Sequence, residues 1–133
     1  MTASNNLQTA KEFIKAVESR AGAEDVAKFY HDEIVQTEFP NAVTKNIAVR
    51  TIDDLRRVSE KGKQVLSREQ YEIVHAHESG NTVIIEAEWT GTVAIPLGKL
   101  EPGDKIKAYF AQVFEFKEGK IFRQRNYDCF EPF

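Results

Sequence analysis

The stretch AYFAQVFEFKEGKIFRQRNYDCFEPF, residues 108–133, predicts a β-hairpin at the end of the chain, with the turn at Lys117-Glu118-Gly119-Lys120. Side chains along a strand point alternately to opposite faces. One face of the first strand therefore carries Phe110, Gln112, Phe114 and Phe116. One face of the second carries Phe122, Gln124, Asn126 and Asp128. Packed cores seldom gather so many polar groups on one face, so the hairpin predicts the wall of a wet pocket for a small molecule.

Length and charge limit the classes of protein to consider. The 133 residues predict a single domain, 1–133, with residues 1–6 as a disordered tail. A net charge of -3 without a dense Lys/Arg run argues against nucleic-acid or anionic-membrane partners. No apolar run is long enough for a membrane span, and the first residues do not have the pattern of a secretory signal, so we expect a cytoplasmic protein.

The rest of the sequence predicts helices followed by strands. Helices are expected over 7–20, over 23–30 and from Thr51 to about residue 66, and strands over 34–39, 70–77, 82–95, 105–117 and 121–130. A loop is expected over residues 42–50. Segregated helices and sequential hairpins predict an α+β fold. In the expected architecture, a cone-shaped, curved antiparallel sheet wraps around the N-terminal helices and encloses a cavity.

Two segments carry a resemblance to a known family: FIKAVESRAGAEDVAKFYHDEIVQTEFPN, residues 13–41, and VFEFKEGKIFRQRNYDCFEPF, residues 113–133. With the element order between them, they resemble the SnoaL-like branch of the nuclear-transport-factor-2-like (NTF2-like) superfamily. That group includes polyketide cyclases, ketosteroid isomerases and limonene-epoxide hydrolases. The resemblance implies the cystatin-like α+β roll of that superfamily over nearly the whole chain. It does not name a reaction, because this fold carries many chemistries.

The resemblance to ketosteroid isomerases places a catalytic base at Glu38, at the end of the first strand. The tyrosine donor of those enzymes is replaced here by Phe13, and their second, acidic donor by Gln112. A single neutral amide stabilises an enolate less well than two strong donors. The resemblance therefore keeps the base and loses the oxyanion hole.

The resemblance to the other two enzyme classes argues against one mechanism and gives one candidate catalytic residue. The epoxide hydrolases need an Asp-Arg-Asp set, and the matching positions here are Ala87, Trp89 and Asn126. None of these side chains ionises, so that mechanism is not expected. The polyketide cyclases use an acid on the last strand, and Asp128 is the local candidate.

Each candidate acid also has a purely structural interpretation. Glu38 is either a general base whose pKa burial raises, or a rim carboxylate in a salt bridge with Arg123 or Arg125. Asp128 is either an acid or base opposite Glu38, or a carboxylate that orders the last strand. The sequence leaves both choices open.

The remaining site candidates are binding residues: Gln36, Trp89, Gln112, Phe114, Gln124 and Asn126. Their amides would orient a ligand oxygen or would satisfy one another in a polar network. His75 and His77 alternate on one strand face but have no acidic or cysteine partner at a telling distance, so no metal is expected. No nucleotide or flavin cofactor is expected either, because the chain has no glycine loop of the phosphate-binding type.

The sequence therefore favours a domain that binds a small apolar molecule bearing a carbonyl or hydroxyl group. If it is an enzyme, Glu38 or Asp128 would move a proton next to a carbonyl, as an isomerase or a cyclase does. The alternative is a non-catalytic binding or dimerisation module. The strand over 105–117 is apolar on its outer face too, which predicts a homodimer packed sheet against sheet, unless the stems of Arg123 and Arg125 cover that face.

Overall fold

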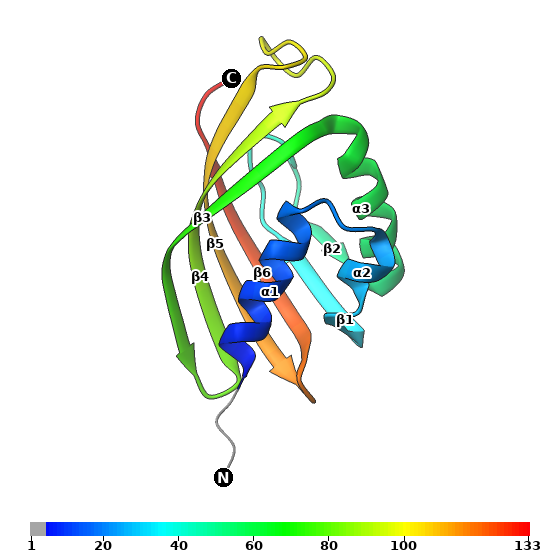
Figure 1. Cartoon of the computed structure of the whole chain (residues 1–133), viewed down its shortest axis with the longest axis vertical. Coiled ribbons are helices and arrows are strands. Elements are labelled where there is room, and N and C mark those ends of the chain that lie inside the picture. The colour runs from blue at the N-terminus through cyan, green and yellow to red at the C-terminus, as the bar shows by residue number, and fades with distance from the viewer. Residues whose placement is uncertain (1–4) are drawn as a thin grey trace.

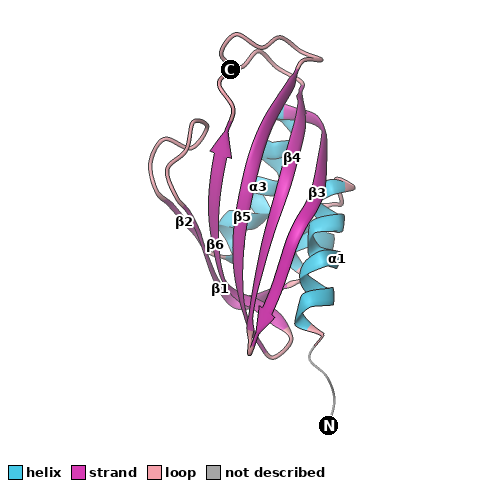
Figure 2. Cartoon of the chain, turned by 90° about the vertical axis from the view of Figure 1, so that its left-hand side faces the viewer, coloured by secondary structure: helices cyan, strands magenta, loops and turns pink. Residues whose placement is uncertain are grey.

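One curved sheet and three helices make up the computed structural model, which describes residues 5–133 (Figure 1). The helices are α1 (Asn6–Glu18), α2 (Ala23–Ala27) and α3 (Ile52–Val65). The strands are β1 (Tyr30–Glu38), β2 (Ala48–Arg50), β3 (Leu66–Ser79), β4 (Thr82–Val93), β5 (Lys105–Lys117) and β6 (Lys120–Phe130). All three helices lie against one face of the sheet, and the described residues place no helix on the other face (Figure 2). The expected α+β architecture is confirmed.

The strand order is β2-β1-β6-β5-β4-β3, and one pairing differs from the expected antiparallel sheet. β3 to β6 form sequential antiparallel hairpins, but β1 pairs with β6 in parallel. The sheet is therefore mixed. The parallel register places Gln36 beside Gln124 and Glu38 beside Asn126, which brings the polar residues of two distant segments together.

Several boundaries differ from those expected. The second helix ends at Ala27, and Tyr30 begins β1. The expected loop over 42–50 contains the short strand β2. Of the expected tail, residues 1–4 lie outside the described residues, whereas Asn6 belongs to α1. No helix of the described chain is long and apolar enough to cross a membrane.

α1 packs on the sheet through an apolar stripe. Ala10, Phe13 and Ile14 recur at helical spacing and are buried. The ring of Phe13 meets that of Phe114 edge to face, with ring centroids 5.8 Å apart. Phe114 is therefore a fully buried core residue beneath α1. The sequence predicts that it lines the cavity, and it does not.

α3 begins at Ile52, and Thr51 is its N-cap residue, as the sequence predicts. The carboxylate of Asp54 accepts a hydrogen bond from the Thr51 backbone N–H at 2.9 Å and forms a capping box with it. Leu55, one turn into the helix, is buried. This arrangement holds α3 over the part of the sheet that α1 leaves uncovered (Figure 1).

A bulge in the last hairpin changes which side chains face inward. Glu115 pairs with Arg123 and Phe116 pairs with Ile121, so the second strand has one extra residue. Ile121 is fully buried, whereas Phe122 leaves the inner face and lies against the guanidinium of Arg123. The prediction that Phe122 shares a face with Gln124, Asn126 and Asp128 is therefore wrong.

Trp89 anchors a second apolar cluster at the other end of the sheet. Its ring stacks on Phe110 at 5.2 Å between centroids and meets Phe130 at 5.9 Å. It also covers Gly91, where an added Cβ would lie 2.5 Å from a ring carbon. Trp89 is thus a packing residue and does not line the cavity, contrary to the expectation.

We predict opposite effects for alanine at two glycines. Gly91→Ala should lower the free energy of unfolding by roughly 1–3 kcal/mol, because the new methyl group displaces the Trp89 ring. Gly62→Ala should raise it by up to ~1 kcal/mol, because that position lies inside α3 with open space around it. Urea denaturation measures both. Equal stability of the two variants would contradict this packing.

Candidate functional site

A cavity of about 250 Å³ lies between the sheet, α2 and α3. Its volume is near the lower end of ligand pockets, which begin at roughly 300 Å³, so it suits a small molecule. The helices supply an apolar wall that includes Val26, Ala27, Leu55 and Val58. The strands supply a polar floor made of Gln36, Glu38, Arg50, Gln112, Gln124 and Asn126.

The structure brings most of the predicted residues together. Those that line the cavity are Gln36, Glu38, Gln112, Gln124 and Asn126. Trp89 and Phe114 belong to the core instead, as described above. Asp128 does not line the cavity either, but it is largely buried and close enough to Glu38 and Arg50 to interact electrostatically with both.

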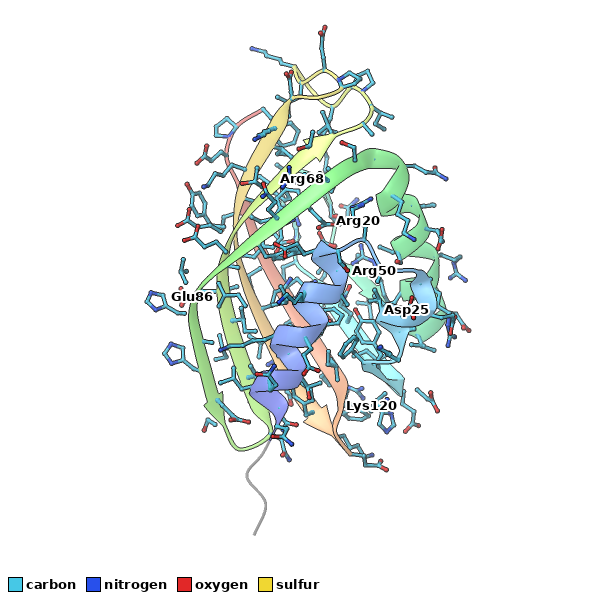
Figure 3. All side chains as sticks on the ribbon, in the orientation of Figure 1. Arg20, Asp25, Arg50, Arg68, Glu86 and Lys120 are labelled. Atoms are coloured by element: carbon cyan, nitrogen blue, oxygen red, sulfur yellow. The ribbon has the colours of Figure 1, made fainter. Side chains whose placement is uncertain are left out.

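Arg50 is the partner of Glu38, and sequence reasoning missed it. β2 pairs with β1 so that Arg50 lies opposite Gln36. Its Nη1 lies 2.8 Å from Oε1 of Glu38, and both side chains are about 15% exposed. Figure 3 shows Arg50 on the helix side of the sheet, whereas Glu86 points away from the other face.

The expected partners of Glu38 were wrong. Arg123 donates to the backbone carbonyl oxygen of Glu33, and Arg125 pairs with Glu115. Both arginines occupy alternate positions to Gln124 and Asn126 along β6, so they point to the other face of the sheet.

Glu38 is held in its charged form. Burial raises the pKa of its carboxyl, but hydrogen bonds from Asn41 and Arg50 outweigh that effect, so the pKa lies below its ordinary value. Asn41 Nδ2 donates to Oε2 at 2.9 Å, while Arg50 holds the other oxygen. The raised pKa expected for Glu38 is therefore wrong.

Asp128 has the opposite environment. Its Oδ1 is the one buried side-chain polar atom without a hydrogen-bond partner among the described residues. Burial, and then the negative charge of Glu38, raise the pKa of Asp128 from 3.8 to about 7, although Arg50 lowers it in part. A carboxyl group of this kind exchanges its proton near neutral pH.

The inward-facing amides form a buried network. Gln36 Nε2 donates to Gln124 Oε1 at 3.2 Å, and Gln124 Nε2 donates to Asn126 Oδ1 at 3.0 Å. The side chain of Gln112 makes no hydrogen bond of this kind with the described residues, although it lines the cavity. The amides thus satisfy one another in part and leave groups free to meet a ligand.

A second polar cluster, also missed, lines the cavity through Arg20 and Glu69. Arg20 Nη1 lies 2.7 Å from Oε2 of Glu69, and Trp89 Nε1 donates to the other Glu69 oxygen at 3.1 Å. Burial raises the pKa of Glu69, and hydrogen bonds from Trp89 and Arg20 offset this in part. The alternating positions of Glu69 and Tyr71, which place both on the inner face of β3, are the sequence pattern that could have predicted this cluster.

The described residues contain no group of three His, Cys, Asp or Glu side chains able to hold a metal. The rings of His75 and His77 stack 6.4 Å apart, and both residues are exposed. The polar floor offers hydrogen-bond donors and the Glu38 carboxylate, and the Asp128 carboxyl group lies close enough to interact with that charge.

Comparison with known proteins assigns the family. The model of the SnoaL-like domain matches residues 10–124. The chain belongs to the SnoaL-like family, as the sequence predicted. No curated protein sequence matches it.

Solved structures share the fold of this SnoaL-like protein. The proposed polyketide cyclase IdmH from Streptomyces antibioticus has a TM-score of 0.78 and 14% identity, over 94% of this chain and 92% of its own. An NTF2-like protein from Burkholderia pseudomallei has a TM-score of 0.76 and 16% identity, over 97% and 92%. TerC, co-crystallised with polyporic acid, has a TM-score of 0.72 and 13% identity, over 96% and 92%.

We predict that Asp128 makes stability fall as pH rises. Between its ordinary pKa of 3.8 and about 7, the folded state keeps a proton that the unfolded state has lost, so folding weakens through this window. Asp128→Asn removes this loss. Compared with the unaltered protein, Asp128→Asn should gain little free energy of unfolding at acid pH and on the order of a few kcal/mol above neutrality.

Urea denaturation across the pH range measures this difference. Asp25→Asn, which changes an exposed carboxylate on α2, is the matched control and should follow the unaltered protein. Parallel pH profiles for Asp128→Asn and the unaltered protein would show that the carboxyl of Asp128 titrates normally.

Proposed function

We propose that the cavity binds a small, largely apolar molecule through a carbonyl or hydroxyl oxygen, and that Asp128 removes a proton from the carbon next to the carbonyl. The observation that carries this proposal is the largely buried Asp128 carboxyl group, which has an oxygen without a hydrogen-bond partner, interacts with the charge of Glu38 on the cavity floor and has a pKa of about 7. A structural carboxylate would be expected to have hydrogen-bond partners for both oxygens.

The two carboxyl groups have different roles in this proposal. Glu38 stays ionised in its contact with Arg50, and its charge adds to the effect of burial in raising the pKa of Asp128. Asp128 takes the proton from carbon, and the electron pair of the broken C–H bond passes to the carbonyl oxygen. The amides of Gln112 and Asn126, which line the cavity, are placed to hold that oxygen.

The enolate formed in this step has two outcomes. In an isomerase, Asp128 returns the proton to a different carbon. In a cyclase, the enolate carbon attacks a second carbonyl group of the same molecule, and the proton passes to the new alkoxide. The similarity to IdmH, a proposed polyketide cyclase, supports the second outcome, and TerC shows that a protein of this fold accepts an organic ligand.

One observation favours a non-catalytic binding module as the second candidate. The position that would be a base in a ketosteroid isomerase, Glu38, is held in a salt bridge, and Phe13 belongs to the core. In a binding module, Asp128 would orient the ligand as a neutral hydrogen-bond donor. Proton exchange by a bound ketone distinguishes the two candidates.

We also propose that the outer face of the sheet pairs two copies of the chain. Tyr109 is 45% exposed, Tyr127 is 42% exposed and Ile84 is 38% exposed. Val113 and Ala111 lie between them on the same face. Exposed apolar side chains that adjoin one another on a sheet favour association, and a two-fold dimer is the commonest form. A cytoplasmic location remains a prediction.

We predict that the protein catalyses exchange of the methyl protons of acetophenone with deuterated water. Asp128→Asn should cut that rate by about a hundredfold or more, the range for loss of a general base. Glu38→Gln should retain more activity, and its pH midpoint should move to more acid values, because the negative charge that raises the pKa of Asp128 is lost. NMR loss of the methyl signal measures the rate.

Asp25→Asn is again the control and should exchange the probe as the unaltered protein does. If acetophenone binds and exchanges no faster than in buffer, the binding module is correct. If Glu38→Gln is the more damaging change, the roles given to the two carboxyl groups are reversed.

For the dimer, light scattering at micromolar concentration should give twice the 15.2 kDa mass of the chain. Val113→Asp should give a folded monomer, because it places a charge in the middle of the apolar outer face. Lys61→Asp, on the exposed surface of α3, should leave the mass unchanged. A single-chain mass that does not change on concentration would rule out the dimer.

A further inference from the structure

The amides on the cavity floor form a chain of hydrogen bonds that has a direction. Arg50 Nη1 donates to Gln36 Oε1 at 3.1 Å. Gln36 Nε2 donates in turn to Gln124 Oε1 at 3.2 Å, and Gln124 Nε2 donates to Asn126 Oδ1 at 3.0 Å. Gln36 and Gln124 each accept a hydrogen bond on the Arg50 side and donate one on the other side, and Asn126 accepts the last one.

Arg50 fixes this direction. A guanidinium group carries donors only, so Gln36 must turn its oxygen toward Arg50 and its NH₂ group toward Gln124. The same choice then passes to Gln124 and from there to Asn126. A flipped Gln36 would set donor against donor at a buried position, since only 6% of Gln36 is exposed.

The chain ends at Nδ2 of Asn126. Its Oδ1 is used by Gln124, and none of the hydrogen bonds among residues 5–133 uses its Nδ2. Asp128 Oδ1 is the one buried side-chain polar atom in that part of the chain without a partner, so Nδ2 is not sealed in the core. Asn126 lines the cavity, opposite Gln112 on β5.

We propose that Arg50 is a positioning residue that acts through Gln36 and Gln124 to present Nδ2 of Asn126 as a donor, so that the site selects a ligand with an acceptor oxygen, a carbonyl or enolate, over a ligand that only donates. This rests on the function proposed above and deepens it, because it selects the carbonyl class from the two that the site residues allowed. A donor fixed before the reaction also meets the negative charge that develops on a carbonyl oxygen when the neighbouring C–H bond breaks.

The positive charge at the other end of the chain strengthens this effect. Hydrogen bonds in series polarise one another, and Arg50 is itself a charged donor at the start of the series. Arg50 therefore affects a ligand oxygen at Asn126 without touching it.

Gln36→Glu tests the direction of the chain. A carboxylate at this position accepts from Arg50 and must also accept from Gln124, which forces the Gln124 amide to turn over. Oδ1 of Asn126 then loses its donor, Nδ2 is drawn to Gln124, and the cavity receives an acceptor in place of a donor. The side chain keeps its size, and the new carboxylate shares Arg50 with Glu38.

Two probes of equal size report the change. Acetophenone carries a carbonyl oxygen that only accepts, and indole carries an N–H that only donates; both have the same number of non-hydrogen atoms. We expect the unaltered protein to bind acetophenone more tightly, and Gln36→Glu to change the ratio of the two affinities by about tenfold or more in favour of indole. Gln64→Glu, an exposed position on α3, is the charge-matched control and should keep the original ratio.

Arg50 variants give a second test that does not depend on the folding of Gln36→Glu. Arg50→Lys keeps a group that only donates, and should keep the preference for acetophenone. Arg50→Met removes the constraint, and should bring the two affinities close together. If Arg50 is only structural, both probes will weaken by the same factor in each variant, and the proposal is overturned.

A ligand-free readout separates this inference from the proposed function. Side-chain amide protons of Asn126 should exchange with solvent faster in the unaltered protein than in Gln36→Glu, where they donate to Gln124. An unchanged or opposite order contradicts the directed chain, whether or not a probe binds. If neither probe binds the unaltered protein, the proposed function and the ligand preference both fail, and the exchange rates still decide the role of Arg50.

Discussion

The contact between Arg50 and Glu38 determines the chemistry of the cavity. A guanidinium with 16% of its side chain exposed is costly to bury unless charged and polar partners surround it, and Glu38 and Gln36 supply them. Together with the hydrogen bond from Asn41, the contact keeps Glu38 ionised. Burial, and then the negative charge of Glu38, keep a proton on Asp128 up to near-neutral pH. The same guanidinium sets the direction of the buried amides. The two carboxyl groups thus differ, because Arg50 holds Glu38 in its charged form, whereas burial favours the protonated form of Asp128.

The elements that the sequence predicts well are those with a repeated pattern. Buried side chains alternate with more exposed ones over many residues of the long strands β4 and β5. The capping pair of Thr51 and Asp54 predicts the start of α3. The parallel pairing of β1 with β6 joins segments far apart in the chain, so no turn signal predicts it. The bulge that turns Ile121 inward adds one residue to the strand, which a strict alternation of faces does not anticipate.

The site residues also separate into those that a sequence pattern predicts and those that only the tertiary structure places. Gln124 and Asn126 face the cavity because alternation along one strand is enough to place them. Arg50 could not be found, because three residues after an irregular loop show no period. Without Arg50, the burial of Glu38 suggested a raised pKa, and only the three-dimensional contact reverses that conclusion. Trp89 was assigned to the cavity from its residue type, whereas its position depends on tertiary packing around Gly91.

The most direct test of this account is an NMR titration of the side-chain carboxyl carbons of Glu38 and Asp128 in the ligand-free protein. We expect Asp128 to titrate with a midpoint at about pH 7, and Glu38 to titrate below its ordinary pKa of 4.5. In Arg50→Met, the pKa of Glu38 should rise, because the hydrogen bond and the positive charge are lost. An Asp128 that titrates near 3.8, or a Glu38 whose pKa is the higher of the two, would contradict the central role of the Arg50–Glu38 contact.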